Sequence, residues 1–466
     1  MNPKKSATFI KNAVLFLAGS VFSKLLSFIL LPLYTTYIPT ADFGAYDVAT
    51  LYVSLISGVV YFEIWSAMLR YMYDFEDDKK MSVVKSSLKI FGISTAVFVG
   101  ASWVVCMIAD IAYSAYVIMW GIATALSTYL SFLARGLGKN IDFALSGIIN
   151  TATCLGMNIL LVVVFRMNFS ALYIGSIVGA LAQTGYLLLR LKVVPQIMKV
   201  KSDSNLTKEI FRYAFPLCFN TAAYWVLNSS ARLIYNALCG DAASGIFSVG
   251  NKFGTIIVLA TTCFTYAWQD MSFSASNTAD STKLYTQASK KYLLFLGSCL
   301  CVALPALRLV FPFLVKGDYT EAVVYIPLFL IVAVISGYSS FIGNIFYAIK
   351  NTKVISASTV VSGIVTVSCA VPYIKLLGAN GTNVAILTGF ALNVIIRFVL
   401  LKRIINFKIP VGEVVFITLW TLATSLVYIK ADTLISCLLF SLNAVIMIIA
   451  FRRDIKAFLK KLKLIK

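Results

Sequence analysis

The sequence predicts an all-α membrane protein with about fourteen transmembrane helices, and three observations support this fold class. Hydrophobic residues make up 60% of the 466-residue chain and charged residues only 13%. The mean hydropathy of +0.87 is far above that of soluble domains, which need more polar residues to cover their surface. Apolar stretches of about twenty residues, enough to cross a hydrocarbon core of roughly 30 Å, recur along the whole chain.

Length and composition assign fourteen of these stretches as spans. Three lysines, Lys4, Lys5 and Lys11, precede the first stretch and give it the look of a secretory signal. The stretch is too long for a signal peptide and no A-x-A cleavage site follows, so we assign it as a span. The predicted spans are 13–34, 48–69, 88–109, 114–134, 143–165, 170–189, 213–235, 246–268, 292–314, 323–348, 354–374, 383–401, 411–429 and 433–450.

The basic residues in the connections give this span count an orientation. If the N-terminus lies inside, inner connections hold about eight times as many Lys and Arg as outer ones, in agreement with the positive-inside rule. The outer connections hold only Arg166, Lys316, Lys375 and Lys430. Both termini are therefore predicted to be cytoplasmic. The same distribution explains the net charge of +21, so nucleic acid is not needed as a partner.

A weak internal repeat predicts how the spans are organised. Gly245-Ile246-Phe247 follows Gly44-Ala45-Tyr46 by 201 residues, and each motif comes after a span and a turn. Because six is an even number of spans, two six-span repeats enter the membrane from the same side. The predicted domains are an N-terminal six-helix lobe, a cytoplasmic linker, a C-terminal six-helix lobe, and two further helices with a basic cytoplasmic tail; they cover residues 1–190, 191–212, 213–401 and 402–466.

The residue types present argue against covalent chemistry. The chain has no histidine, which is the commonest acid-base group and metal ligand in proteins. The nine cysteines are scattered without a C-x-x-C motif. The acidic run Asp74–Asp78 is followed by two lysines and is typical of a solvated loop rather than a metal site. We therefore predict a protein that is not an enzyme, with no metal site and no cofactor.

Four basic residues fall inside predicted spans. A charge at the centre of a membrane helix costs about 2.5–3.5 kcal/mol on insertion scales, so such residues pair, snorkel or face a wet cavity. Lys24 lies deepest, followed by Lys252, whereas Arg232 and Arg308 lie near the outer ends of their spans, where snorkelling is an alternative. We expect these four residues to line a cationic cavity, which would attract an anionic substrate.

Two carboxylates also lie within or at the ends of spans. Glu63 falls towards the inner end of the second span and Asp270 at the inner end of the eighth. One interpretation of Glu63 is pairing with a neighbouring cation, and the other is coupling of transport to H⁺ or Na⁺. Asp270 is either a second coupling residue or a solvated residue at the membrane boundary.

Several short motifs, in the same order along the chain, resemble the bacterial polysaccharide flippases of the Wzx type. The resemblance covers nearly the whole chain, although each motif is short. The motifs are Leu31–Ile38 with Asp42–Tyr46, Arg70–Tyr73 before the acidic stretch, Leu137–Asn140, Asn228–Ser230 with Arg232, and Gly245–Val249 with Lys252.

The resemblance implies the multidrug/oligosaccharidyl-lipid/polysaccharide exporter fold, with two six-helix lobes in a V and two C-terminal helices. It implies a bacterial inner-membrane flippase of O-antigen, capsule or exopolysaccharide repeat units linked to undecaprenyl pyrophosphate, with a polysaccharide polymerase and a chain-length regulator as partners. The pyrophosphate would bind the intramembrane cations. In many relatives an Asp precedes the Arg of the seventh span, where this chain has Ala231, so Arg232 is expected to lack that neutralising partner.

Three other functions fit parts of the pattern. A lipid II flippase shares the fourteen spans and the cationic cavity. A drug or metabolite antiporter of the same superfamily typically carries carboxylates in its lobes, where this chain carries cations. A membrane glycosyltransferase or polymerase usually presents acidic or histidine residues in sizeable outer loops, but the outer connections here are short.

Overall fold

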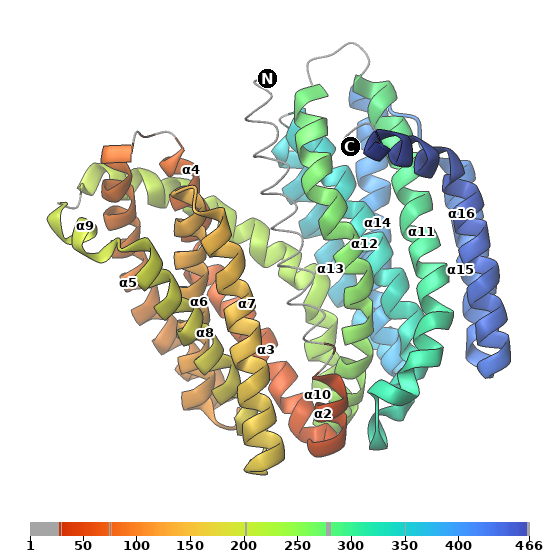
Figure 1. The fold of residues 1–466 in the computed structure, drawn as a ribbon, viewed down its shortest axis with the longest axis horizontal. Helices are drawn as coiled ribbons and strands as arrows, with labels where there is room; N and C mark the ends of the chain where they lie inside the picture. The colour runs from red at the N-terminus through yellow and green to blue at the C-terminus, as the bar shows by residue number, and fades with distance from the viewer. Residues whose placement is uncertain are drawn as a thin grey trace. The chain divides into compact units, whose positions relative to one another are not determined.

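The computed structural model describes residue 28 and residues 30–73, 75, 77–200, 203–275, 281–349 and 351–463, and every regular element in these ranges is a helix (Figure 1). The elements are α2 (Leu31–Tyr37), α3 (Thr40–Val60), α4 (Ile64–Met72), α5 (Asp77–Ile108), α6 (Ser114–Gly136), α7 (Asn140–Asn158), η1 (Ile159–Val164), α8 (Ser170–Leu191), α9 (Val194–Lys199), α10 (Ser204–Ala275), α11 (Ser281–Leu314), η2 (Gly317–Tyr325), α12 (Ile326–Ala348), α13 (Thr352–Leu377), α14 (Ala379–Ile405), α15 (Val411–Lys430) and α16 (Thr433–Lys463).

The helices confirm an all-α, multi-pass membrane protein. Among the described residues, 12 helices are long and apolar enough to cross a membrane. One of them, α10, contains the seventh and eighth predicted spans, because Gly240 has the non-helical angles φ 82° and ψ 176° and divides the helix into two arms. The predicted first span, 13–34, lies mostly outside the described residues.

The predicted boundaries of the second span, 48–69, are wrong. The helix α3 begins at Thr40 and ends at Val60. Phe62 and Glu63 then adopt left-handed backbone angles, with φ of 51° and 54°, which a right-handed helix does not accommodate. The polar residues at the start of α3 made this segment look like an outer connection, but Asp47 lies two turns inside the helix.

The described chain forms two compact units. Unit 1 comprises residues 1–248, 317–319 and 359–389, and unit 2 comprises the remainder, 249–316, 320–358 and 390–466. The helix α10 contributes to both units. The lobes that the repeat predicts, 1–190 and 213–401, stay a prediction.

In unit 1, α6, α7 and α8 pack side by side through small and polar residues (Figure 1). A Cβ atom on Gly175 or Gly179 would lie within 3 Å of atoms of α7, so glycine is needed where α8 crosses this helix. Gln183 joins the three helices: its Nε2 donates to Ser131 Oγ at 2.8 Å, and its Oε1 accepts from Asn150 Nδ2 at 2.6 Å. These hydrogen bonds satisfy amide groups that lipid could not satisfy.

In unit 2, α11 is the helix against which the C-terminal pair α15 and α16 packs. Asn443 of α16 is fully buried; its Nδ2 donates to the Cys301 carbonyl at 2.7 Å, and its Oδ1 accepts from Trp420 at 2.9 Å. On the other side of the unit, the buried Arg397 of α14 donates to Ser358 of α13 and Ser339 of α12, at 3.1 and 2.7 Å. Polar side chains therefore tie this unit together as well.

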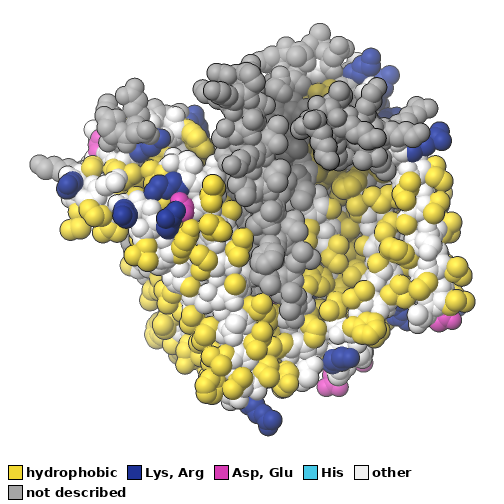
Figure 2. All heavy atoms as spheres, viewed as in Figure 1, with side chains coloured by type: hydrophobic (Ala, Val, Ile, Leu, Met, Phe, Trp, Pro, Cys, Tyr) yellow, Lys and Arg dark blue, Asp and Glu magenta, His cyan; other side chains and the backbone are white. Residues whose placement is uncertain are grey.

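Hydrophobic side chains cover the lengths of the helices in Figure 2, and Lys and Arg gather towards the helix ends. The exposed apolar residues include many on α15 and α16, such as Leu419, Leu426, Leu438 and Ile449. A surface of this kind is stable only in a hydrocarbon environment, as expected for a protein embedded in a bilayer.

Replacing Gln183 by Leu should lower the stability of unit 1 by about 1 kcal/mol, because the Asn150 amide loses its acceptor within the membrane. We expect a thermal unfolding temperature a few degrees lower for the purified protein in detergent. The matched control is Gln196→Leu in α9, where the glutamine is exposed. Equal unfolding temperatures for Gln183→Leu and the wild type would contradict a stabilising role for this network.

Candidate functional site

The candidate site lies where α3 and the first arm of α10 run antiparallel within unit 1. Asp47 of α3 forms an ion pair with Arg232 of α10. Two helical turns further along both helices, Trp225 Nε1 donates to Ser54 Oγ at 2.9 Å. Beyond the end of α3, Thr221 Oγ1 lies 3.5 Å from Glu63 Oε1. We call this row of polar contacts the α3–α10 seam.

The ion pair at the seam is largely buried. The side chains of Arg232 and Asp47 are 14% and 15% exposed, and Nη2 of the arginine donates to Oδ2 of the aspartate. The expectation that Ala231 leaves Arg232 without a carboxylate partner is therefore wrong, since Asp47 supplies the partner from a different helix. The guanidinium is only partly satisfied, because its Nε is buried with no hydrogen-bond partner.

The two helices that carry the repeated glycine motif cross within this unit. A Cβ atom on Gly44 would lie 1.8 Å from the Asp241 carbonyl oxygen, and one on Gly245 would lie 1.9 Å from the Thr40 carbonyl oxygen. The two contacts are related by the same 201-residue offset as the sequence motif. Glycine is required at both positions because the backbones touch, as at other close crossings of membrane helices.

Glu63 is held by neutral hydrogen-bond donors. Its Oε2 accepts from Trp65 Nε1 at 3.0 Å and from Ser66 Oγ at 2.8 Å. No Lys or Arg in the described part of the chain lies within ion-pairing distance of this carboxylate. Pairing of Glu63 with a neighbouring cation, one of the two interpretations of the sequence, is therefore not seen among the described residues. The other interpretation, coupling of transport to H⁺ or Na⁺, stays a prediction.

The other predicted site residues belong to unit 2 or lie outside the described part of the structure. Lys252 is half-buried on the second arm of α10 and belongs to unit 2. Arg308 of α11, also in unit 2, lies with its guanidinium carbon 5.5 Å from the centre of the Tyr428 ring. Asp270 lies in α10, but its side chain is outside the described part of the structure, and Lys24 is outside it altogether.

The seam contains residues that the sequence did not single out as functional. Asp47 lies one residue before the predicted second span, and Thr221 and Trp225 carry no motif. The repeated glycines did mark the crossing, although only as a repeat. An acidic residue one turn after Gly44 could have been recognised as intramembrane if α3 had been extended back to Pro39, whose fixed φ suits a helix start.

Comparison with solved structures defines the class of the fold. The chain is similar to the lipid II flippase MurJ in an inward closed conformation, with a TM-score of 0.72 and 16% identity over 95% of this chain and 100% of that one. It is also similar to an inward-facing multidrug resistance MATE transporter of the MOP superfamily, with a TM-score of 0.64 and 11% identity over 88% of this chain and 98% of that one. The chain thus shares the fold of these two solved structures.

A further similar structure is a MOP-superfamily transporter from Pyrococcus furiosus, described as having a binding pocket of reversed polarity. Its TM-score is 0.61, at 11% identity over 84% of this chain and 94% of that one.

A family model described as polysaccharide biosynthesis protein matches residues 9–268, which include α3 and most of α10. The chain belongs to this family. No curated protein matches it in sequence.

Neutralising one partner of the Asp47–Arg232 pair should destabilise the protein by about 3 kcal/mol, because the remaining charge stays buried without compensation. We expect Asp47→Asn and Arg232→Gln each to lower the unfolding temperature, and the double variant to lower it less than the two effects added together. The control is Asp142→Asn, which removes an ion pair with the exposed Arg190 and should have a much smaller effect. Additive single effects would show that the two side chains do not interact.

Gly44→Ala should force α3 and α10 apart at their crossing and destabilise the protein by about 1–3 kcal/mol. Gly92→Ala in α5 is the matched control, because no atom lies within 4 Å of a Cβ at that position. Unfolding temperatures of the two purified variants compare the crossing with an open helix surface. A Gly44→Ala protein as stable as Gly92→Ala would mean that the backbones do not touch.

Proposed function

We propose that the protein flips undecaprenyl-pyrophosphate-linked oligosaccharide repeat units from the cytoplasmic to the outer leaflet of the bacterial inner membrane. Its termini would lie in the cytoplasm. Membership of the polysaccharide biosynthesis family supports this proposal, as does the fold shared with MOP-superfamily transporters. In such a pathway the protein would pass its product to a polysaccharide polymerase and a chain-length regulator.

The partly satisfied Arg232 is the observation that carries the proposal. Its Nη2 binds Asp47, whereas its Nε–H is buried without an acceptor. A buried donor without a partner costs about 1–3 kcal/mol, which an incoming acceptor recovers. Phosphate oxygens are strong acceptors for guanidinium groups, so the pyrophosphate of a lipid carrier is the ligand that this donor suits best.

Further positive charge would come from the other intramembrane cations. Lys252 is half-buried on the second arm of α10, and Lys24 lies deep in the predicted first span. We propose that both attract the pyrophosphate through a low-dielectric surrounding, in which Coulomb attraction is stronger than in water. The charge of Asp47 offsets part of the positive charge of Arg232, so we propose that Lys24 adds to the net attraction.

We propose that the Gly44–Gly245 crossing closes the outer side in an alternating-access cycle. Both helices begin at their predicted outer ends next to this crossing, with α3 starting at Thr40 and the second arm of α10 starting after Gly240. Opening towards the outside would then require these two helices to separate.

Glu63 is our candidate for coupling to H⁺ or Na⁺. Its three hydrogen-bond donors are uncharged, and it lies in the short turn between α3 and α4, at the opposite end of α3 from the glycine crossing. A change of its charge would therefore act on the helix that closes the outer side. Asp270 is a second candidate from the sequence.

A lipid II flippase is the alternative that a specific observation favours, because the structure of MurJ matches over its whole length. Its substrate also joins a glycan to a lipid through phosphate, so the same cations would bind the phosphate of that substrate. A drug or metabolite antiporter is supported by the fold of the MATE transporters alone.

Depletion of the protein in its native host should remove surface polysaccharide and leave lipid-linked repeats accumulated on the cytoplasmic side. Lys24→Gln should reduce export about tenfold or more through loss of a charged contact with phosphate, while membrane insertion is retained. The control is Lys192→Gln, in an exposed connection. Normal surface polysaccharide after depletion would refute the proposal. Loss of viability with accumulated wall precursors would indicate the lipid II alternative, and drug sensitivity alone would indicate an antiporter.

A further inference from the structure

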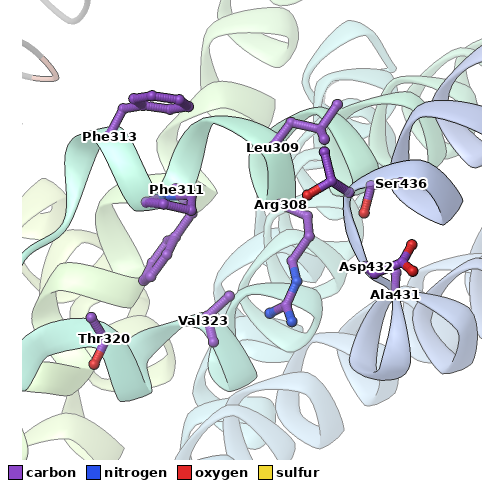
Figure 3. Close-up of a pocket in the computed structure, with 11 residues that line it drawn as sticks. Arg308, Leu309, Phe311, Phe313, Thr320, Val323, Ala431, Asp432 and Ser436 are labelled. Atoms are coloured by element: carbon purple, nitrogen blue, oxygen red, sulfur yellow. The ribbon is translucent and has the colours of Figure 1, made fainter.

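Unit 2 contains a cavity of about 570 Å³ at the ends of α11, η2 and the α15–α16 connection. Its lining combines one cation with hydroxyl groups and aromatic rings. Figure 3 shows Arg308 extending from α11 towards the space between Val323 and Asp432. Phe311 and Phe313 line the cavity from the end of α11, and Ser436 lines it from the first turns of α16.

The arginine in this cavity is held in place by an aromatic ring. The guanidinium of Arg308 lies 5.5 Å from the centre of the Tyr428 ring, and this tyrosine is 1% exposed. The Tyr428 hydroxyl donates to the Val323 carbonyl at 3.0 Å, which fixes the ring. Within the described residues, no carboxylate forms an ion pair with Arg308. The guanidinium is thus positioned without a direct ion pair to a described carboxylate.

The one carboxylate in the lining has a different role. Asp432 precedes α16, and its Oδ1 accepts from the Ile435 backbone N–H at 2.8 Å. Its charge is opposed by the positive end of the helix dipole. One turn into α16, Ser436 is fully buried and its Oγ has no hydrogen-bond partner. A fixed cation and a buried hydroxyl without a partner thus border the same cavity.

We propose that this cavity binds the phosphate group of a lipid. A guanidinium with nearby hydroxyl donors suits phosphate oxygens, which accept several charge-assisted hydrogen bonds. The ligand is a lipid because apolar walls continue from the polar end: Phe313 is 75% exposed, next to Pro312 and Leu309. Arg308 lies six residues before the end of α11, about 9 Å along a helix, near the depth of lipid headgroups.

This site goes beyond the proposed function, because it would bind a lipid phosphate whatever molecule the protein transports. Two sources share the chemistry. One is a bilayer phospholipid that stays at the protein surface, and the other is a polyprenyl phosphate carrier. The positive-inside pattern predicts that the cavity faces the outer leaflet, where a flipped carrier would arrive.

The experiment measures lipid binding to the full-length purified protein by thermal stabilisation in detergent. The probes are phosphatidylglycerol, undecaprenyl phosphate, and undecaprenol, which has the same chain without phosphate. We expect at least one phosphate-bearing probe to stabilise the wild type, and Arg308→Gln to weaken its apparent affinity about tenfold or more. The apparent affinity of Arg308→Lys should lie between those of the wild type and Arg308→Gln, because lysine keeps the charge but lacks the planar guanidinium with its several donors.

Arg166→Gln is the control, since Arg166 is an exposed cation in another predicted outer connection. Gel filtration verifies that each variant is folded, and Ser436→Ala gives a second, less disruptive test of the same cavity. Stabilisation by phosphatidylglycerol alone would identify the ligand of the cavity as a bilayer phospholipid. Stabilisation by undecaprenyl phosphate alone would identify it as a polyprenyl phosphate carrier. Equal stabilisation by undecaprenol, no effect of either phosphate probe, or unchanged binding in Arg308→Gln would overturn the proposal.

Discussion

The Asp47–Arg232 ion pair is the interaction on which the candidate site depends. A charge inside a bilayer has no water to solvate it, so its partner has to come from the protein. Here the partner comes from α3, and this sets the antiparallel register that also joins Ser54 to Trp225. The same requirement explains the buried polar contacts elsewhere, including those of Gln183 in unit 1 and Asn443 in unit 2.

Much of the fold could be predicted from the sequence, because span length and loop charge are both set by the bilayer. Apolar length identified the described spans, including the two arms that Gly240 separates within α10. The start of α3 could not be found in this way. Its first turns carry Thr40, Asp42 and Asp47, and a hydropathy pattern cannot distinguish polar residues in a loop from polar residues that have partners on a neighbouring helix.

The candidate site was predictable only in part. Intramembrane charge singled out Arg232, Arg308 and Glu63, because residue type and approximate depth can both be read from the sequence. Their long-range partners were not predictable, since Asp47, Tyr428 and Thr221 lie far from them in sequence. The repeat motif indicated that Gly44 and Gly245 are equivalent, but not that they touch. Equivalent residues of two repeats touch one another only when both lie next to the axis that relates the repeats, and the sequence motif does not show where that axis lies.

The glycine crossing brings two helix backbones into close contact without intervening side chains. Side chains that interdigitate bury apolar area, and each square ångström of that area has to be exposed again when they separate. At Gly44 and Gly245 the backbones meet without intervening side chains, so the contact is close but buries little apolar side-chain surface. If this crossing closes the outer side as proposed, each opening would expose little apolar side-chain surface and would therefore cost little free energy.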